Sequence, residues 1–288
     1  MNDILVRTGG LSFAYPERAS TLFRRPALRE VVRHVDLAVP RGSVLGLVGE
    51  SGSGKTTLGR LLVRLLQPTS GGIAFDGIEI GDLGEAELRP LRARIQMIFQ
   101  DPQSSLNPRL RLAVALTRPL QVFGRLKGRR DQRDRAAQLL DLVGLAPHFI
   151  DRYPHELSGG QRQRAGIARA LALEPDFIVA DEIVSGLDVS TQAHILLLIR
   201  ELRRRLGLTL VFISHDLSVI RVLCDDVAIL QHGEIVESGP VAKIFERPQH
   251  PYTRDLLSAI PLPDVEPGWL NDQREVSVPQ QQQQGSAA

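Results

Sequence analysis

The sequence predicts an α/β fold with a mostly parallel sheet, a small antiparallel β lobe and an inserted helical lobe. Short apolar segments typical of buried strands alternate with helical segments, which is the pattern of a parallel βαβ sheet. Residues 4–40 are β-rich instead, and between residues 101 and 165 amphipathic helical segments replace the strands. At 288 residues the chain has the length of about two structural units, or of one large unit with an inserted lobe.

The composition is that of a soluble globular protein, with 43% hydrophobic residues and 35 Lys and Arg against 33 Asp and Glu. The resulting net charge of +2 gives little support to a nucleic-acid partner. A single cysteine, Cys224, excludes an intramolecular disulfide or a cysteine cluster for zinc or iron–sulfur, and it favours a reducing compartment. The N-terminal segment lacks a secretory signal pattern, and the apolar runs fall short of the ~20 residues that a membrane crossing needs. We therefore expect a chain that does not span a bilayer and reaches one only by docking onto another protein.

The first half of the chain contains the β lobe and a strand, loop and helix in succession. Two β-rich pieces, ILVRTGGLSFAY and VVRHVDLAV, flank an Arg- and Pro-bearing stretch that we expect to be a loop. From Val44 an apolar strand leads into a glycine-rich turn and then a helical pattern, KTTLGRLLVRLLQ, that Pro68 ends. An Asp-Gly turn between β-prone flanks at residues 73–80 and a buried strand over Arg94–Phe99 follow.

The second half returns to strands after the helical lobe, which includes the amphipathic segment RDQRDRAAQLLDLVGL. Strand patterns at residues 176–181 and 209–214 enclose a helical pattern at residues 190–207, as in a parallel βαβ unit. After about Pro248 this alternation ends. Residues 266–288, which finish in a Gln-rich run, are predicted to be a disordered tail.

The segment GESGSGKTT matches the GxxxxGK[ST] pattern of a phosphate-binding loop and lies between a predicted strand and a predicted helix. Its glycines let successive backbone N–H groups turn inward around phosphate oxygens, at a helix N-terminus that favours negative charge. We expect Lys55 to reach the β and γ phosphates of a nucleotide and the Thr56 hydroxyl to bind Mg²⁺. A glycine-rich turn with a solvated lysine is the alternative, and the flanking strand and helix speak against it. The candidate nucleotide-binding residues of this segment are Gly49, Glu50, Ser51, Gly52, Ser53, Gly54, Lys55, Thr56 and Thr57.

Two adjacent acids end the apolar strand FIVADE. Because the carboxyl ends of strands face the ligand site in open α/β sheets, Asp181 is predicted to hold Mg²⁺ directly or through water. Glu182 would accept a proton from the water that attacks the γ phosphate. Adjacent acids are more often simply solvated, but a phosphate-binding loop in the same chain favours the functional interpretation.

Between these two motifs lies LSGGQ, Leu157–Gln161, a string with a chance frequency on the order of one in a million per position. With it, the chain resembles the ATP-binding subunits of ABC transporters from Tyr15 to about Pro261. The resemblance implies a RecA-like P-loop NTPase core with an antiparallel β lobe and an inserted helical lobe. It also implies a head-to-tail dimer, with a second copy or a paralogue, that holds two ATP molecules between its subunits. ATP hydrolysis would be coupled to transport across a membrane.

Further site residues follow from the resemblance. Tyr15 matches the aromatic residue that stacks on adenine, with a tyrosine of the β-lobe core as the alternative. Gln100 matches the glutamine that touches Mg²⁺ and the attacking water and senses the membrane partner. His215 matches a histidine that contacts the γ phosphate, with a structural histidine at a strand end as the alternative.

The signature residues Ser158, Gly159, Gly160 and Gln161 are expected, by the same resemblance, to bind the γ phosphate of the ATP held by the opposite subunit. A hydroxyl and exposed N–H groups at the start of a strong helix also make an anion site on physical grounds. An ordinary helix N-cap by Ser158 would use the same donors. Asp188 matches the loop that crosses to the partner subunit.

The chain departs from the family pattern DEPxSALD at two positions, Ile183 and Gly186. Ile183 replaces a turn proline beside the catalytic acid, and Gly186 adds backbone freedom. Neither change removes a functional group. Hydrolysis is therefore expected to be retained, with the stiffness of the loop and the turnover rate left open.

The approach to the signature, YPHELSGGQRQR, resembles importers of the family. Arg247–Pro261 resembles the C-terminal element of ATPases that serve oligopeptide, dipeptide and nickel permeases. A helix that simply packs on the core is a second interpretation of this segment, and the two are compatible. Two different ATPase subunits serve such permeases, and this chain resembles the one without a C-terminal cysteine cluster. We expect an ABC ATPase domain over residues 4–265, with this element at about residues 246–265.

The resemblance implies membrane-spanning permease subunits as partners at the cytoplasmic face of the cell membrane, and an extracytoplasmic solute-binding protein that takes part indirectly. We expect a cytoplasmic helix of the permease to insert beside Gln100 and DPQSSLNPRLRL, with Arg109 and Arg111 at the contact. Cargo choice belongs to the other components. Two alternatives remain: a soluble ABC-type ATPase without a transport role, which usually has a coiled-coil insertion or a second cassette, and an inactive regulatory subunit.

Overall fold

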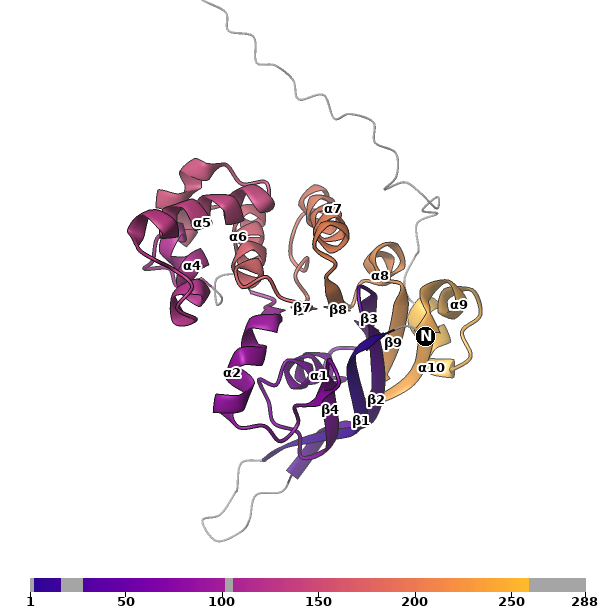
Figure 1. The fold of residues 1–288 in the computed structure, drawn as a ribbon. Helices are drawn as coiled ribbons and strands as arrows, with labels where there is room; N and C mark the ends of the chain where they lie inside the picture. The colour runs from indigo at the N-terminus through magenta and orange to yellow at the C-terminus, as the bar shows by residue number, and fades with distance from the viewer. Residues whose placement is uncertain (1–2, 17–27, 102–105, 259–288) are drawn as a thin grey trace, which may run out of the picture.

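The structure, a computed structural model, describes residues 3–16, 28–101 and 106–258. The predicted disordered tail at residues 266–288 and most of the predicted loop between the first two β pieces lie outside the described residues. Within them, two sheets and two groups of helices make up the molecule (Figure 1).

A six-stranded sheet forms the centre of the molecule. Its strands, in spatial order, are β10 (Glu234–Pro240), β9 (Asp226–Gln231), β3 (Val44–Val48), β8 (Thr209–Ile213), β7 (Phe177–Asp181) and β6 (Ile95–Ile98). All neighbouring pairs are parallel except β9 and β10. Strands β3, β7 and β8 are buried at every position, which explains why they are continuous apolar runs in the sequence. The parallel pairing brings the carboxyl ends of β3, β8, β7 and β6 to one edge.

The β lobe is a four-stranded antiparallel sheet. Its strands, in spatial order, are β2 (Leu28–Pro40), β1 (Ile4–Pro16), β4 (Ser70–Phe75) and β5 (Ile78–Glu79). The predicted Asp-Gly turn joins β4 to β5, with positive φ angles of 53° at Asp76 and 77° at Gly77.

The helical lobe follows β6 along the chain. It comprises α4 (Leu112–Val122), α5 (Arg129–Leu142), the 3₁₀ segments η1 (Pro147–Asp151) and η2 (Pro154–Glu156), and α6 (Gly159–Leu171). Figure 1 shows these helices gathered at the end of the molecule opposite to β1 and β4. Residues 106–165, the described part of the lobe, contain no strand, as the sequence predicts.

The remaining helices lie around the sheet. They are α1 (Lys55–Leu62), α2 (Glu85–Arg94), α7 (Val189–Leu206), α8 (Leu217–Leu223), α9 (Val241–Glu246) and α10 (Pro251–Ser258). Among the described residues, no helix combines the length and the apolar character that crossing a bilayer would require.

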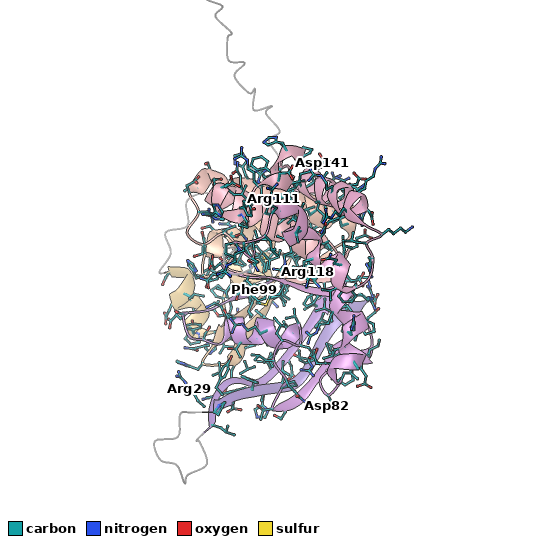
Figure 2. The ribbon with its side chains drawn as sticks, turned by 90° about the vertical axis from the view of Figure 1, so that its left-hand side faces the viewer. Arg29, Asp82, Phe99, Arg111, Arg118 and Asp141 are labelled. Carbon is teal, nitrogen blue, oxygen red and sulfur yellow. The ribbon has the colours of Figure 1, made fainter. Side chains whose placement is uncertain are left out.

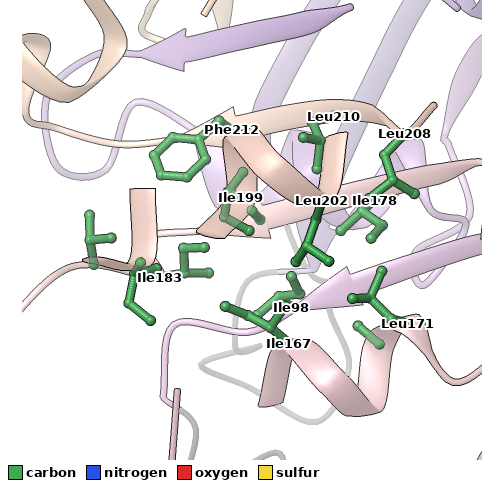
Figure 3. Packing of buried hydrophobic residues seen from close by; sticks show 14 of the residues in the cluster. Ile98, Ile167, Leu171, Ile178, Ile183, Ile199, Leu202, Leu208, Leu210 and Phe212 are labelled. Carbon is green, nitrogen blue, oxygen red and sulfur yellow. The ribbon is translucent and has the colours of Figure 1, made fainter. Parts of the chain in front are cut away.

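The two faces of the central sheet belong to two hydrophobic clusters. Because side chains alternate along a strand, Ile178 of β7 packs with the helical lobe while Phe177 packs with the β lobe and α1. Figure 3 shows the first cluster, where Ile167 and Leu171 of α6 lie close to Ile98 of β6. Helix α6 thus ties the helical lobe to the strands that carry the candidate site.

The first helix is shorter than the sequence predicts. The pattern from Lys55 was expected to continue to Pro68, but α1 ends at Leu62. Arg64 takes a positive φ of 54°, and its guanidinium turns inward to donate to the carbonyl oxygens of Ile80 at 2.7 Å and Leu83 at 3.0 Å. These tertiary hydrogen bonds outweigh the helical periodicity of the segment.

Candidate functional site

The predicted phosphate-binding loop connects β3 to α1. The side chain of Lys55, the first residue of α1, is only 6% exposed, and its Nζ donates to the carbonyl oxygens of Gly49 at 2.8 Å and Glu50 at 2.7 Å. Burial lowers the pKa of Lys55, while the nearby carboxylates of Glu182 and Asp181 oppose this effect. The ammonium of Lys55 therefore binds carbonyl oxygens of the same loop that is predicted to bind phosphate.

Glycine is required at two loop positions. A Cβ on Gly49 would lie 2.1 Å from the carbonyl oxygen of Leu230 in β9. Gly54 has a φ of 106°, and a Cβ there would lie 2.7 Å from the carbonyl oxygen of Val31 in β2. The loop thus packs directly against backbone of both sheets, which fixes its position.

Asp181, at the carboxyl end of β7, faces the start of α1. The hydroxyl of Thr56 donates to Oδ1 of Asp181 at 3.1 Å. Asp181 is 3% exposed, and burial raises the pKa of its carboxyl although the hydrogen bond from Thr56 acts in the opposite sense. The two residues that the sequence predicts as metal ligands from distant motifs are therefore in contact.

These residues fit a hydrated divalent cation held with phosphate oxygens. A buried carboxylate, a hydroxyl and a neighbouring amide side chain are the oxygen donors that Mg²⁺ uses, with one or two carboxylates and the substrate's phosphates completing the shell. A nearby cation would also stabilise the ionised form of Asp181, whose burial is otherwise unfavourable. In the described part of the chain, no three His, Cys, Asp or Glu side chains cluster to bind an ion alone.

Glu182 follows Asp181 at the end of β7 and is bonded to the end of the neighbouring strand β8. Its backbone N–H donates to the carbonyl oxygen of Ile213 at 3.0 Å, and its φ is 46°, a left-handed value that is uncommon for glutamate. Its Oε2 accepts a hydrogen bond from Nε2 of Gln100 at 2.9 Å, and its Oε1 lies 3.6 Å from Nδ1 of His215. Gln100, Glu182 and His215, from three separate segments, therefore converge, and their catalytic roles stay a prediction.

The signature segment lies at the start of α6, in the helical lobe. Ser158 is the N-cap: its Oγ accepts from the backbone N–H of Gln161 at 3.3 Å, and Oε1 of Gln161 accepts from the N–H of Ser158 at 3.0 Å. The expected N-cap is confirmed, while the phosphate contact to another subunit stays a prediction. A Cβ on Gly160 would lie 2.5 Å from Cγ2 of Thr191, so the signature packs closely on α7.

Asp188 is the N-cap of α7. Its carboxylate accepts from the hydroxyl of Ser190 at 2.6 Å and from the backbone N–H of Thr191 at 2.9 Å. These donors, Ser190 first, hold the pKa of Asp188 far below its ordinary value. Gly186, with a φ of 73°, sits in the turn before this cap, and Ile183 is 1% exposed, so the departure from proline buries an apolar side chain.

Tyr15 is the next-to-last residue of β1 and is partly exposed, with its ring edge-on to Phe13 at a centroid distance of 4.8 Å. This placement is compatible with both expectations for Tyr15, an adenine contact and a β-lobe packing residue.

One contact of the phosphate-binding loop has no local signal in the sequence. The hydroxyl of Tyr252 in α10 accepts a hydrogen bond from the backbone N–H of Glu50 at 2.9 Å. The two residues are 202 positions apart. The sequence marks the segment around Tyr252 as a distinct element but does not indicate that it reaches the loop.

Comparisons with known proteins agree with this geometry. A family model described as ABC transporter matches residues 32–185, and one described as the C-terminal region of oligopeptide/dipeptide transporters matches residues 236–286. A protein of Brucella ovis named as a peptide import ATP-binding protein is 51% identical over 260 residues, 90% of this chain and 80% of that protein. A protein of Sinorhizobium fredii named as a peptide ABC transporter ATP-binding protein is 47% identical over 279 residues, 97% of this chain and 79% of that protein.

Solved structures share the fold. The dimeric ATP-binding cassette MJ0796 bound to ADP and phosphate matches with a TM-score of 0.72 and 30% identity, over 82% of this chain and 99% of that one. CbiO1 from Clostridium perfringens, part of an ABC transporter complex, matches with a TM-score of 0.72 and 26% identity, over 85% of this chain and 92% of that one. The chain therefore belongs to the ABC transporter family, as an ATP-hydrolysing subunit of the oligopeptide/dipeptide type.

Proposed function

We propose that this chain hydrolyses ATP to power an ABC importer that takes up peptides. The observation that supports this most is the convergence of Lys55, Thr56, Asp181, Gln100 and Glu182 at the carboxyl edge of one parallel sheet. The names of its relatives, which refer to peptide import and peptide transport, indicate the cargo class. They favour transport over the alternative of a soluble ATPase without a membrane partner.

Nucleotide binding is assigned to the loop Gly49–Thr57. Lys55 would leave the carbonyl oxygens of Gly49 and Glu50 and bind the β and γ phosphates of ATP, while Tyr15 would stack on the adenine. Thr56, Asp181 and Gln100 would hold Mg²⁺. When bound, the metal neutralises charge that develops on the phosphates.

Hydrolysis is assigned to Glu182 and its neighbours. The Glu182 carboxylate would accept the proton of the attacking water, and it becomes a stronger base when its amide contact with Gln100 opens. His215, whose Nδ1 lies near Glu182, would contact the γ phosphate and fix the position of that carboxylate.

The second half of each ATP site is assigned to a partner ATPase subunit, either a second copy or a paralogue. Ser158 and the N–H groups of Gly159, Gly160 and Gln161 lie at a helix N-terminus, where a γ phosphate would be favoured. Asp188 would carry its loop across the same interface. ATP bound between the subunits would stabilise the closed dimer, and its hydrolysis would release it.

The permease contact is assigned to a groove of about 350 Å³ between the core and the helical lobe. Phe99, Arg118 and Phe123 are among the residues that line it, and Figure 2 places Phe99 and Arg118 at this junction. An amphipathic cytoplasmic helix of a membrane-spanning permease fits such a groove. The chain would then lie at the cytoplasmic face of the membrane, with a solute-binding protein on the other side that never touches it. Part of the predicted docking segment, residues 102–105, lies outside the described residues.

Purification of the tagged chain from membranes tests this assignment. A multi-span permease should copurify with it, and the isolated assembly should show ATP hydrolysis that rises when a peptide-loaded solute-binding protein is added. Absence of any membrane protein from the purified material, together with peptide-independent hydrolysis, would contradict the proposal.

A further inference from the structure

We infer that Tyr252 is a positioning residue of the phosphate-binding loop, through which the C-terminal element controls the affinity for ATP. The inference rests on the proposed role of the loop as the nucleotide site. It concerns a residue outside every motif that carries that proposal.

The contact is made to one particular peptide group. The N–H of Glu50 donates to the Tyr252 hydroxyl at 2.9 Å, and the carbonyl oxygen of the same peptide group, that of Gly49, accepts from Nζ of Lys55 at 2.8 Å. The peptide is therefore hydrogen-bonded at both ends. When Lys55 leaves this carbonyl to bind the phosphates of ATP, the contact with Tyr252 still holds the peptide group from its N–H end.

This peptide group sets the geometry of the loop. Gly49 lies against the carbonyl oxygen of Leu230, so there is no room on that side for the backbone to move. Rotation of the peptide about its flanking bonds would turn the Gly49 carbonyl away from Lys55 and would break the contact with Tyr252. The hydroxyl thus opposes the rotation that would disorder the approach to the phosphates.

Tyr252 is itself held in place. At the start of α10, the backbone N–H groups of Gln249 and His250 donate to the carboxylate of Glu237 in β10, at 2.8 and 3.0 Å. Thr253, the next residue along α10, is fully buried. The Tyr252 ring packs against the main hydrophobic cluster, and burial raises the pKa of its hydroxyl. The Tyr252 side chain is therefore already ordered by its packing, so its hydrogen bond to the loop costs little additional conformational entropy.

Through α10, Tyr252 also links the phosphate-binding loop to the edge of the central sheet. Among the described strands, β10 is the edge strand beside β9, and its Glu237 anchors the start of α10. Any partner that displaces α10 would remove the hydroxyl from Glu50 and weaken ATP binding without touching the nucleotide. The C-terminal element is the part of the chain that the oligopeptide/dipeptide-type model matches. A change in its position would therefore alter the ATP affinity through this contact.

The variant Tyr252→Phe tests the inference because it keeps the ring and removes only the hydroxyl. We expect the dissociation constant of the full-length chain for mant-ATP with Mg²⁺ to rise about 2- to 10-fold, the range expected for one lost neutral hydrogen bond. In the assembled transporter, the KM for ATP should rise by the same factor, with kcat at saturating ATP changed less than about twofold. Hydrogen exchange of the Glu50 amide should accelerate, and the melting temperature should fall by no more than about 4 °C, because only one neutral hydrogen bond is lost.

Tyr153→Phe is the matched control, since Tyr153 lies in the helical lobe beside Arg111. It should leave the mant-ATP affinity and the Glu50 exchange rate unchanged. Unchanged affinity and unchanged KM in Tyr252→Phe would overturn the inference while leaving the proposed function intact. Failure of the wild-type chain to bind mant-ATP at all would overturn both.

Discussion

Gln100 and Glu182 form a hydrogen bond in which Nε2 of the glutamine donates to Oε2 of the glutamate at 2.9 Å. The bond joins the segment after β6 to the end of β7 and engages the carboxylate that is proposed to act as general base. By donating to this oxygen the amide lowers its basicity, so a water molecule meets a stronger base when the amide withdraws. Because Gln100 also lies next to the groove assigned to the permease, a shift of that segment would release the base, which connects docking to hydrolysis through one side chain.

Replacement of Glu182 by glutamine should lower ATP turnover by roughly 10²- to 10⁴-fold, the usual contribution of a general base. Nucleotide affinity should persist, since the phosphate contacts are assigned to other residues. Steady-state hydrolysis and mant-ATP titration check both statements. Glu174→Gln is a matched control because Glu174 also has a positive φ, of 57°, but lies outside the site. Normal turnover in the Glu182 variant would rule out its role as base.

Replacement of Gly160 by alanine should destabilise the chain by about 1–3 kcal/mol through overpacking. The new Cβ would meet Cγ2 of Thr191 at 2.5 Å, and that side chain cannot turn away because its hydroxyl donates to Asp188 at 2.7 Å. The gain in helix propensity, at most about 1 kcal/mol, is too small to compensate.

The second substitution Thr191→Ser removes Cγ2 and keeps the hydroxyl. Urea unfolding should therefore show that the double variant regains the stability of Thr191→Ser alone. If the double variant remains as unstable as Gly160→Ala, the close contact between the signature and α7 is not the cause.

The ion-pair cluster beneath the β lobe should make stability depend on acid pH. Arg94 donates to Asp76 at 2.6 Å, and this contact, followed by that of Arg41, holds the pKa of Asp76 below its ordinary value in spite of partial burial. The stabilisation is complete above the pKa of an unfolded aspartate and is lost as the pH falls through the lower folded-state value.

Asparagine tolerates the left-handed backbone at position 76, so Asp76→Asn removes the charge without straining the turn. Because the ion pair is partly exposed, the variant should lower the free energy of unfolding by about 1 kcal/mol at pH 7. The difference from wild type should shrink toward zero below about pH 4. Unfolding titrations across this range measure it, with the exposed Asp82→Asn as control. A difference that does not vary with pH would contradict the pairing.

Charge reversal at Arg109 should uncouple transport from ATP binding. Arg111 is the less informative position, because its guanidinium lies 5.6 Å from the centre of the Tyr153 ring and 3.6 Å from a carboxylate oxygen of Asp151. In Arg109→Glu, peptide uptake by the assembled transporter should fall at least about fivefold, the lower range of a coupling between sites, with mant-ATP affinity unchanged. Normal uptake would argue against a permease contact at Arg109.

The sequence predicts the chemistry of the site better than its surroundings. The loop from Gly49 and the acids after β7 could be placed because each depends on a local pattern at the end of a buried strand, and Ser158 because N-capping is local. The end of α1 could not be predicted, because it depends on hydrogen bonds from Arg64 to carbonyl oxygens of a later segment. Helix α8 has only seven residues and gives no clear helical period, and the sequence yields no prediction for strands β9 and β10 although they are longer than β3, β7 and β8.

The contact between Tyr252 and Glu50 illustrates the same limit. Nothing near either residue indicates that a helix of the C-terminal element will touch a loop near the N-terminus. Only the order of the strands, with β9 beside β3 and β10 beside β9, brings the two segments together.

In the proposed dimer, ATP is held between the phosphate-binding loop of one subunit and the signature of another. Retention of labelled ATP by the assembled transporter after gel filtration tests it most directly, with Glu182→Gln present to prevent hydrolysis. We expect the nucleotide to stay with this complex and to be lost when the signature serine opposite that loop is replaced by arginine, which is Ser158→Arg where two copies of this chain pair. Equal retention with and without Ser158→Arg, or no retention by the Glu182→Gln complex, would contradict the account.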